Sequence, residues 1–143
     1  MNVIAVMILG ALGGILRFSL ETFGVAGTLL VNLIGSFALG LFTAMVTTKE
    51  FPSWIRNGVG AGLIGSFTTF SSFTNDSVQL MANGLSLAAL YVVVSVVGGI
   101  ILCYAGGRIG RLRVHSDSLE QQSEDNQQGT RDKGHALAKS SRY

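Results

Sequence analysis

Four long apolar stretches occupy most of this 143-residue chain and leave few folds open to it. They cover residues 3–20, 25–46, 55–81 and 85–107. A helix needs about 20 mostly apolar residues to cross the hydrocarbon core of a bilayer, and the second and fourth stretches meet this length without difficulty. Charged residues make up 13% of the chain, against roughly 25% in soluble domains. The sequence therefore predicts an all-α membrane protein with four transmembrane helices.

The first stretch carries Arg17 near its end, where a long side chain can extend to the lipid headgroups. A cleaved signal peptide is the alternative interpretation, and it requires positive charge before the apolar run. Here the arginine follows the run and no basic residue precedes it. We therefore expect a transmembrane helix.

The third stretch is interrupted by glycines and hydroxyl residues. Glycines at 58, 60, 62 and 65 are followed by the run SFTTFSSFTND at residues 66–76. Non-helical backbone survives at membrane depth only where protein or water lines it, and discontinuous helices commonly build ion sites. We expect a helix that is broken near residues 65–68. The alternative is a continuous helix whose small residues allow close packing.

Glycines also recur four residues apart, in the pairs 10 and 14, 58 and 62, and 106 and 110. This spacing lets helix backbones approach one another closely. Taken together, the pairs predict tight packing between the helices.

The last thirty residues have a different composition. Residues 114–143 hold four basic and five acidic residues, few apolar ones, and no aromatic residue before Tyr143. Such a segment cannot bury enough surface to offset the entropy of ordering. The sequence predicts a four-helix transmembrane domain over residues 1–113 and a disordered polar tail over residues 114–143.

Basic residues are concentrated on one side of the predicted membrane domain. With four spans, the N-terminus, the loop at 47–54 and the tail share that side, which holds Lys49, Arg56 and the three arginines of residues 108–113. The other side holds Arg17 alone. Because Lys and Arg favour the cytoplasm, both termini are expected there, in a multi-pass protein of the cell membrane. The arginine cluster is expected to meet anionic lipid rather than nucleic acid.

Few residues in the apolar stretches are suited to catalysis. His115 and His135 lie in the tail, and Cys103 is expected to be an inert core thiol. Nucleotide-binding, metalloprotease and nucleophile-elbow motifs are missing from the sequence. An enzyme is therefore not expected.

Neutral hydrogen-bond donors remain as the candidate functional residues. Thr28, Asn32 and Ser36 follow at intervals of four and share one helical face. The third and fourth stretches add further hydroxyl and amide groups, at Thr69, Ser71, Ser72, Thr74, Asn75 and Ser95. Such groups suit an anion that must shed water and still leave, since a fixed positive charge would bind it too well. Packing between helices is the alternative role for the Ser and Thr residues.

Phe70 and Phe73 lie three residues apart, on one helical face among these hydroxyls. Aromatic rings carry positive edges, which can contact a small, hard anion. Ordinary packing is the alternative for an isolated pair, and the hydroxyls on both sides favour the anion path.

Three segments resemble the Fluc/CrcB fluoride channels. The run GTLLVNLIGSF at residues 27–37 is similar to the family's second-helix signature, and GSFTTFSSF at residues 65–73 is similar to its third-helix signature, usually GGLTTFSTF. The run GGILRF at residues 13–18 is similar to the end of the first helix. The resemblance covers about residues 5–110 in the right order, and it leaves the tail uncovered.

The resemblance implies subunits of four helices that pair as an antiparallel, dual-topology-type dimer with two fluoride pores. It implies that Asn32 is the pore amide, that Phe70 and Phe73 face the ion, and that Ser71 and Ser72, with Thr69, form a polar track. It also implies a structural sodium ion at the dimer interface, held by the backbone carbonyls of Gly65 and Thr68. Asp76 matches an acidic position near a pore mouth. The function that follows is passive fluoride export, which lowers fluoride toxicity.

Two features depart from the family pattern. Ser66 and Phe67 replace the usual Gly-Leu and add bulk beside the break. The charge bias is also unexpected for a subunit that pairs with an inverted copy of itself. A heterodimer with a paralogous subunit is therefore an alternative to the homodimer.

Two other functions compete with the channel. A small four-span proton-coupled multidrug exporter needs a carboxylate within the membrane, and Glu21 and Asp76 lie at span ends. A structural membrane subunit without transport would leave Asn32 and the broken helix unexplained.

Overall fold

The computed structural model describes residues 2–48 and 50–140, and these residues form helices joined by short connections. In chain order the elements are α1 (Asn2–Glu21), α2 (Val25–Thr48), α3 (Ser53–Asn57), the π-helix η1 (Gly58–Ile64), α4 (Gly65–Phe67), α5 (Phe70–Asn83) and α6 (Leu85–Ser140). The prediction of an all-α fold is thus confirmed for the described residues, in which no strand occurs.

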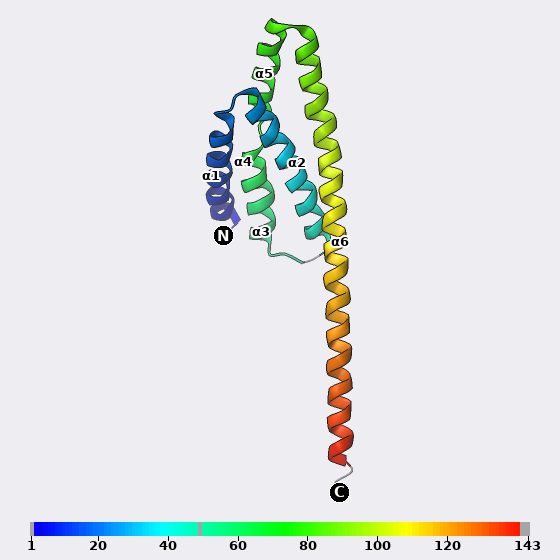
Figure 1. The fold of residues 1–143 in the computed structure, drawn as a ribbon. Helices are drawn as coiled ribbons and strands as arrows, with labels where there is room; N and C mark the ends of the chain where they lie inside the picture. The colour runs from blue at the N-terminus through cyan, green and yellow to red at the C-terminus, as the bar shows by residue number, and fades with distance from the viewer. Residues whose placement is uncertain (1, 49, 141–143) are drawn as a thin grey trace. The chain divides into compact units, whose positions relative to one another are not determined.

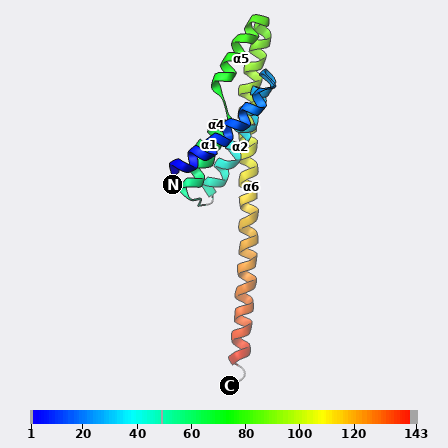
Figure 2. The same cartoon turned by 90° about the vertical axis from the view of Figure 1, so that its left-hand side faces the viewer.

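Three of the described helical segments are long and apolar enough to cross a membrane: Asn2–Glu21, Val25–Thr48 and Leu85–Ser116. The third apolar stretch does not add a fourth segment of this kind, because it is divided among α3, η1, α4 and α5. Within residues 1–111, successive passes along α1, α2, the run from α3 to α5, and the start of α6 alternate in direction (Figures 1 and 2).

The chain separates by its internal contacts into two units, Met1–Arg111 and Leu112–Tyr143. The first unit contains all four apolar stretches. In the second unit the described backbone is helical as far as Ser140, whereas the sequence predicts disorder from residue 114. The segment has no proline to interrupt the helix that continues into it from the apolar part of α6.

Two glycines with positive φ close the short connections. Gly24, at φ +63°, ends the turn between α1 and α2, and its N–H donates to the Glu21 carbonyl oxygen at 2.9 Å. Gly84, at φ +142°, joins α5 to α6, and its N–H donates to the Leu80 carbonyl oxygen at 3.1 Å. Side chains with a Cβ rarely adopt either conformation. These turns bring α2 back beside α1, and α6 back beside α5 (Figure 1).

Glycines set the close approach of the helices, as their spacing predicts. A Cβ on Gly62 would lie 2.9 Å from the Val6 carbonyl oxygen, where η1 packs on α1. A Cβ on Gly106 would overlap the Phe37 carbonyl oxygen, where α6 packs on α2. Their partners in the spacing are crowded too: a Cβ on Gly110 would lie 2.9 Å from the Leu41 carbonyl oxygen, and one on Gly58 would lie 2.8 Å from the Leu9 side chain. Gly10 faces Ser66 Oγ at 3.2 Å. Gly14 is different, because a Cβ there meets no described atom within 4 Å.

The predicted break in the third stretch is confirmed, and it is centred on Thr68 and Thr69. Both residues have extended backbone, with ψ angles of 152° and 126°, between the end of α4 and the start of α5. The Thr69 side chain then caps α5 by accepting a hydrogen bond from the Ser72 N–H at 3.2 Å. The glycine-rich residues before the break form the π-helix η1, which the sequence pattern does not predict.

Candidate functional site

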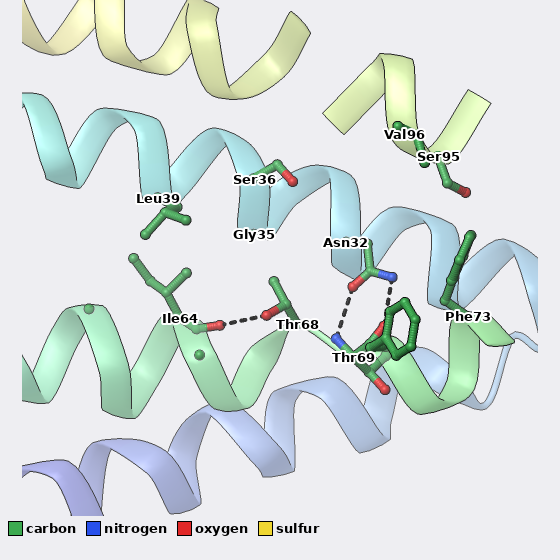
Figure 3. A pocket seen from close by; sticks show the side chains of 13 residues that line it. Asn32, Gly35, Ser36, Leu39, Ile64, Thr68, Thr69, Phe73, Ser95 and Val96 are labelled. Atoms are coloured by element: carbon green, nitrogen blue, oxygen red, sulfur yellow. Dashed lines mark hydrogen bonds between the residues drawn. The ribbon is translucent and has the colours of Figure 1, made fainter. Parts of the chain in front are cut away.

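The site is organised around a pair of hydrogen bonds between Asn32 on α2 and the extended backbone of Thr69. Asn32 Nδ2 donates to the Thr69 carbonyl oxygen at 2.9 Å, and the Thr69 N–H donates to Asn32 Oδ1, also at 2.9 Å (Figure 3). Backbone polar groups away from water need partners, and a broken helix loses its own. The Asn32 amide therefore supplies both partners that Thr69 needs.

The same break releases two backbone carbonyls from their usual helical partners. In an unbroken helix the Thr69 N–H would donate to the Gly65 carbonyl, but here it donates to Asn32. The Ser72 N–H would donate to the Thr68 carbonyl, but here it donates to Thr69 Oγ1. The carbonyls of Gly65 and Thr68 thus have oxygen lone pairs that the helix does not use.

A groove of about 470 Å³ runs along α2 beside the break. Figure 3 shows Asn32 and Ser36 on α2, Thr68 and Thr69 at the break, and Ser95 on α6 around this space. Its lining residues are Asn32, Gly35, Ser36, Leu39, Gly60, Ile64, Gly65, Thr68, Thr69, Phe70, Phe73, Ser95 and Val96. The groove therefore brings together five of the eight predicted pore residues and both predicted sodium ligands.

Phe70 and Phe73 lie together at the start of α5, with ring centroids 6.0 Å apart. Phe73 also stacks on Tyr91 of α6, at 5.5 Å between centroids. Phe70 is 79% exposed. The two rings thus have different surroundings: Phe73 is held by a neighbour, whereas Phe70 projects from the first unit.

The other three predicted pore residues line a second hollow of about 370 Å³. Its lining residues are Glu21, Gly24, Thr28, Ser71, Ser72, Asn75 and Asp76. Thr69 connects the two spaces, because its backbone is bonded to Asn32 and its hydroxyl is bonded to Ser71 and Ser72. The predicted residues therefore do not form one cavity within the described chain, but two hollows joined by a shared threonine.

Hydroxyl groups and a carboxylate form a connected cluster in the second hollow. Thr69 Oγ1 lies 3.1 Å from Ser72 Oγ and 3.3 Å from Ser71 Oγ. Ser72 Oγ in turn donates to Glu21 Oε1 at 2.6 Å. Arg17 Nε lies 3.9 Å from Glu21 Oε2, one helical turn away on α1. Glu21 is thus part of the site, although its position in the sequence suggests only the end of a span.

Asp76 is 8% exposed and lies where α5 meets α6. The Tyr91 hydroxyl reaches Asp76 Oδ2 at 3.5 Å. One turn further along α6, the Ser95 hydroxyl is buried and has no partner among the described residues. The sequence analysis does not identify Tyr91 as a site residue. Tyr91 lies four residues before Ser95, and this spacing, which places both side chains on one face of a helix, is the signal that could identify it.

No group of three His, Cys, Asp or Glu side chains suited to a metal occurs among the described residues. The free carbonyls of Gly65 and Thr68 are a different kind of donor, since uncharged oxygens suit hard monovalent cations.

Comparison with known proteins gives consistent matches. A family model described as "CrcB-like protein, Camphor Resistance (CrcB)" matches residues 4–107. "Fluoride-specific ion channel FluC 2" of Ligilactobacillus salivarius (strain UCC118) is 43% identical over 111 residues, which cover 76% of this chain and 84% of the relative. The protein of the same name from Geobacillus kaustophilus (strain HTA426) is 37% identical over 113 residues, covering 72% and 88%. "Fluoride-specific ion channel FluC" of Shewanella halifaxensis (strain HAW-EB4) is 38% identical over 117 residues, covering 76% and 94%.

Proposed function

The chain belongs to the CrcB family, whose relatives are fluoride-specific ion channels, and on that premise we propose that it exports fluoride from the cytoplasm by passive conduction. Such export lowers the toxicity of fluoride. The protein is a membrane channel and not an enzyme. Proton-coupled multidrug export, the alternative from the sequence, is not favoured, because the matching relatives are named as channels.

The observation that carries this proposal is the groove beside the Asn32–Thr69 pair. Asn32 Nδ2 has two hydrogens and uses one of them on the Thr69 carbonyl. The second hydrogen belongs to a neutral amide that lines the groove. A neutral donor replaces part of an anion's lost water and still lets the ion leave, which conduction requires. Asn32 is therefore the pore amide in this proposal.

The remaining pore residues extend the path on either side of Asn32. Phe70 and Phe73 present ring edges, whose partial positive charge attracts an anion. Hydroxyls supply the other donors, at Thr28, Thr69, Ser71, Ser72 and Ser95. The position of Ser95 supports this role, because its hydroxyl lines the same groove as Asn32.

The membrane crossing and the dimer are parts of the same proposal. The run from α3 to α5 makes the fourth crossing, and the glycine contacts with α1 support it. The groove opens on the surface of the first unit, and Phe70 beside it is 79% exposed. A second subunit packed antiparallel on this face would enclose the path. The partner is a second copy of this chain or a paralogous subunit, embedded in lipid, with both termini of this chain in the cytoplasm.

The Gly65 and Thr68 carbonyls are suited to a structural sodium ion at the dimer interface. They have lost their helical donors, and an antiparallel partner would supply the same pair again. The bulk of Ser66 and Phe67 is compatible with this site, because both side chains face glycines of neighbouring helices, Gly10 and Gly35. Replacing sodium with a large organic cation is expected to lower fluoride flux and to weaken the dimer.

Fluoride and chloride efflux from liposomes containing the purified protein tests the proposal. We expect rapid fluoride efflux, little chloride efflux, and loss of fluoride efflux in Asn32→Asp and Phe70→Ile. The parallel sample is the protein co-expressed with a paralogous subunit. If neither sample moves fluoride, the proposal is wrong.

A further inference from the structure

The hydroxyl cluster of the second hollow ends on a carboxylate. Glu21 is the last residue of α1, and its Oε1 accepts from Ser72 Oγ at 2.6 Å, the shortest contact in the cluster. A carboxylate that carries its charge can only accept hydrogen bonds. In the bond between Ser72 and Glu21, Ser72 is therefore always the donor. This fixes the hydrogen bonds that the Thr69 and Ser71 hydroxyls can make in turn.

Each hydroxyl has one hydrogen, so the donor in each of the remaining hydroxyl–hydroxyl bonds is fixed as well. Because Ser72 gives its hydrogen to Glu21, its bond with Thr69 at 3.1 Å must use the Thr69 hydrogen. Because Thr69 gives its hydrogen to Ser72, its bond with Ser71 at 3.3 Å must use the Ser71 hydrogen. All three hydroxyl hydrogens thus point toward Glu21. Thr69 Oγ1 also accepts from the Ser72 N–H, so the free lone pairs at the end away from Glu21 are those of Ser71.

This direction opposes the binding of an anion, which needs hydrogens rather than lone pairs. Building on the proposed function, we propose that Glu21 is a positioning residue: it sets the direction of the Ser71–Thr69–Ser72 hydroxyl chain and thereby limits the conduction of fluoride. Glu21 acts through Ser72 and need not touch the ion itself.

Arg17 offers Glu21 a second partner. The Arg17 Nε atom lies 3.9 Å from Glu21 Oε2. Arg17 Nε is buried and has no hydrogen-bond partner among the described residues. Ser72 and Arg17 face different oxygens of the Glu21 carboxylate, so a closer ion pair with Arg17 would draw the carboxylate away from Ser72 and allow the hydroxyl chain to reverse. Asp76 of α5 is the other acidic side chain that lines this hollow.

The test is a double-mutant cycle on the full-length protein, with fluoride efflux from liposomes as the readout. The variants are Glu21→Gln, Ser72→Ala and the double variant, and the matched control is Glu50→Gln, whose exposed side chain lies in the connection before α3. A glutamine can donate as well as accept, so Glu21→Gln removes the fixed direction with little change of size. A cycle separates an effect that passes through Ser72 from an effect of charge alone.

We expect Glu21→Gln to raise the fluoride efflux rate by roughly tenfold to a hundredfold, the scale of one hydrogen bond to a charged group. In the Ser72→Ala background the same substitution should have no effect, and Glu50→Gln should match the wild type. An equal gain in both backgrounds would show that charge alone is responsible and would overturn the proposal. Lower efflux in Glu21→Gln would also overturn it.

Infrared spectroscopy tests the hydrogen bond without any transport. The carboxylate band that disappears in Glu21→Gln should shift in Ser72→Ala, and an unshifted band contradicts the proposed chain. If the band shifts in Ser72→Ala but the wild-type protein moves no fluoride, the proposed function is rejected and the direction of the hydrogen bonds is kept.

Discussion

Asn32 on α2 pairs with both the N–H and the carbonyl of Thr69, at 2.9 Å each, across the point where the third apolar stretch loses its helical hydrogen bonds. One side chain thus stabilises the break and lines the groove beside it. Structure and conduction therefore depend on the same amide in this account.

Removing this amide is expected to destabilise the fold as well as to stop conduction. In Asn32→Ala, both backbone groups of Thr69 lose their partners, and we expect a loss of about 1–3 kcal/mol in the free energy of unfolding. Ser36→Ala is the control, since it removes a hydroxyl from the same groove and keeps the Asn32–Thr69 pair. Denaturant titration in detergent measures both variants; equal stability of the two would contradict the structural role of Asn32.

The packing of α2 on α6 gives a second prediction. A Cβ on Gly40 would overlap the carbonyl oxygen of Cys103, whereas a Cβ on Gly14 meets no described atom within 4 Å. Gly40→Ala should therefore lower the unfolding midpoint, because the new methyl group would collide with the backbone of α6 and one of the two helices would have to move. Gly14→Ala should leave the midpoint unchanged or raise it, since alanine favours helix over glycine by about 1 kcal/mol. The reverse order would show that the two helices are not held this closely.

The two phenylalanines should separate conduction from stability. Phe70 is 79% exposed in the first unit, whereas Phe73 stacks on Tyr91. We expect Phe70→Ile to lose fluoride efflux and to cost the subunit fold less stability than Phe73→Ile, because Phe70 has one ring contact, with Phe73, whereas Phe73 has two. Phe73→Ile should lose efflux and also about 1 kcal/mol of stability, the contribution typical of an aromatic pair. Efflux assays and unfolding of the same samples make the comparison; similar losses of stability would contradict the distinction.

The part of the second unit beyond Ser116 is expected to be dispensable for transport. The family match ends at residue 107, and the helical span suited to a membrane ends at Ser116. A chain cut after Ser116 should therefore move fluoride at the wild-type rate, as liposome efflux per unit of reconstituted protein would report. A rate reduced by tenfold or more at equal reconstitution would assign the segment a part in conduction.

The sequence predicts the faces of this fold better than its contacts. The spacing of Asn32 and Ser36 places both on one side of α2, and both line the same groove. Thr28 shares that spacing and yet lines the second hollow, because the face continues past the Asn32–Thr69 pair. Periodicity gives a residue's direction from its own helix, but not the backbone group that it meets.

Long-range pairs explain what sequence reasoning missed. Ser72 and Glu21 are separated by 51 residues, and their contact depends on how α5 packs near the end of α1. The break itself was predictable within a few residues from its glycines and hydroxyls, whereas its position at Thr68 and Thr69 follows from the capping of α5 by Thr69. For residues 114–140, a composition without an apolar core predicts no tertiary packing, but it does not exclude a helix.

The most direct test of the central claim is the reversal potential of the current through a planar bilayer containing the protein, under a fluoride gradient. A passive, fluoride-selective channel predicts reversal at the Nernst potential of fluoride, unchanged by a pH gradient. Reversal near zero, or a reversal potential that follows the pH gradient, would contradict the account.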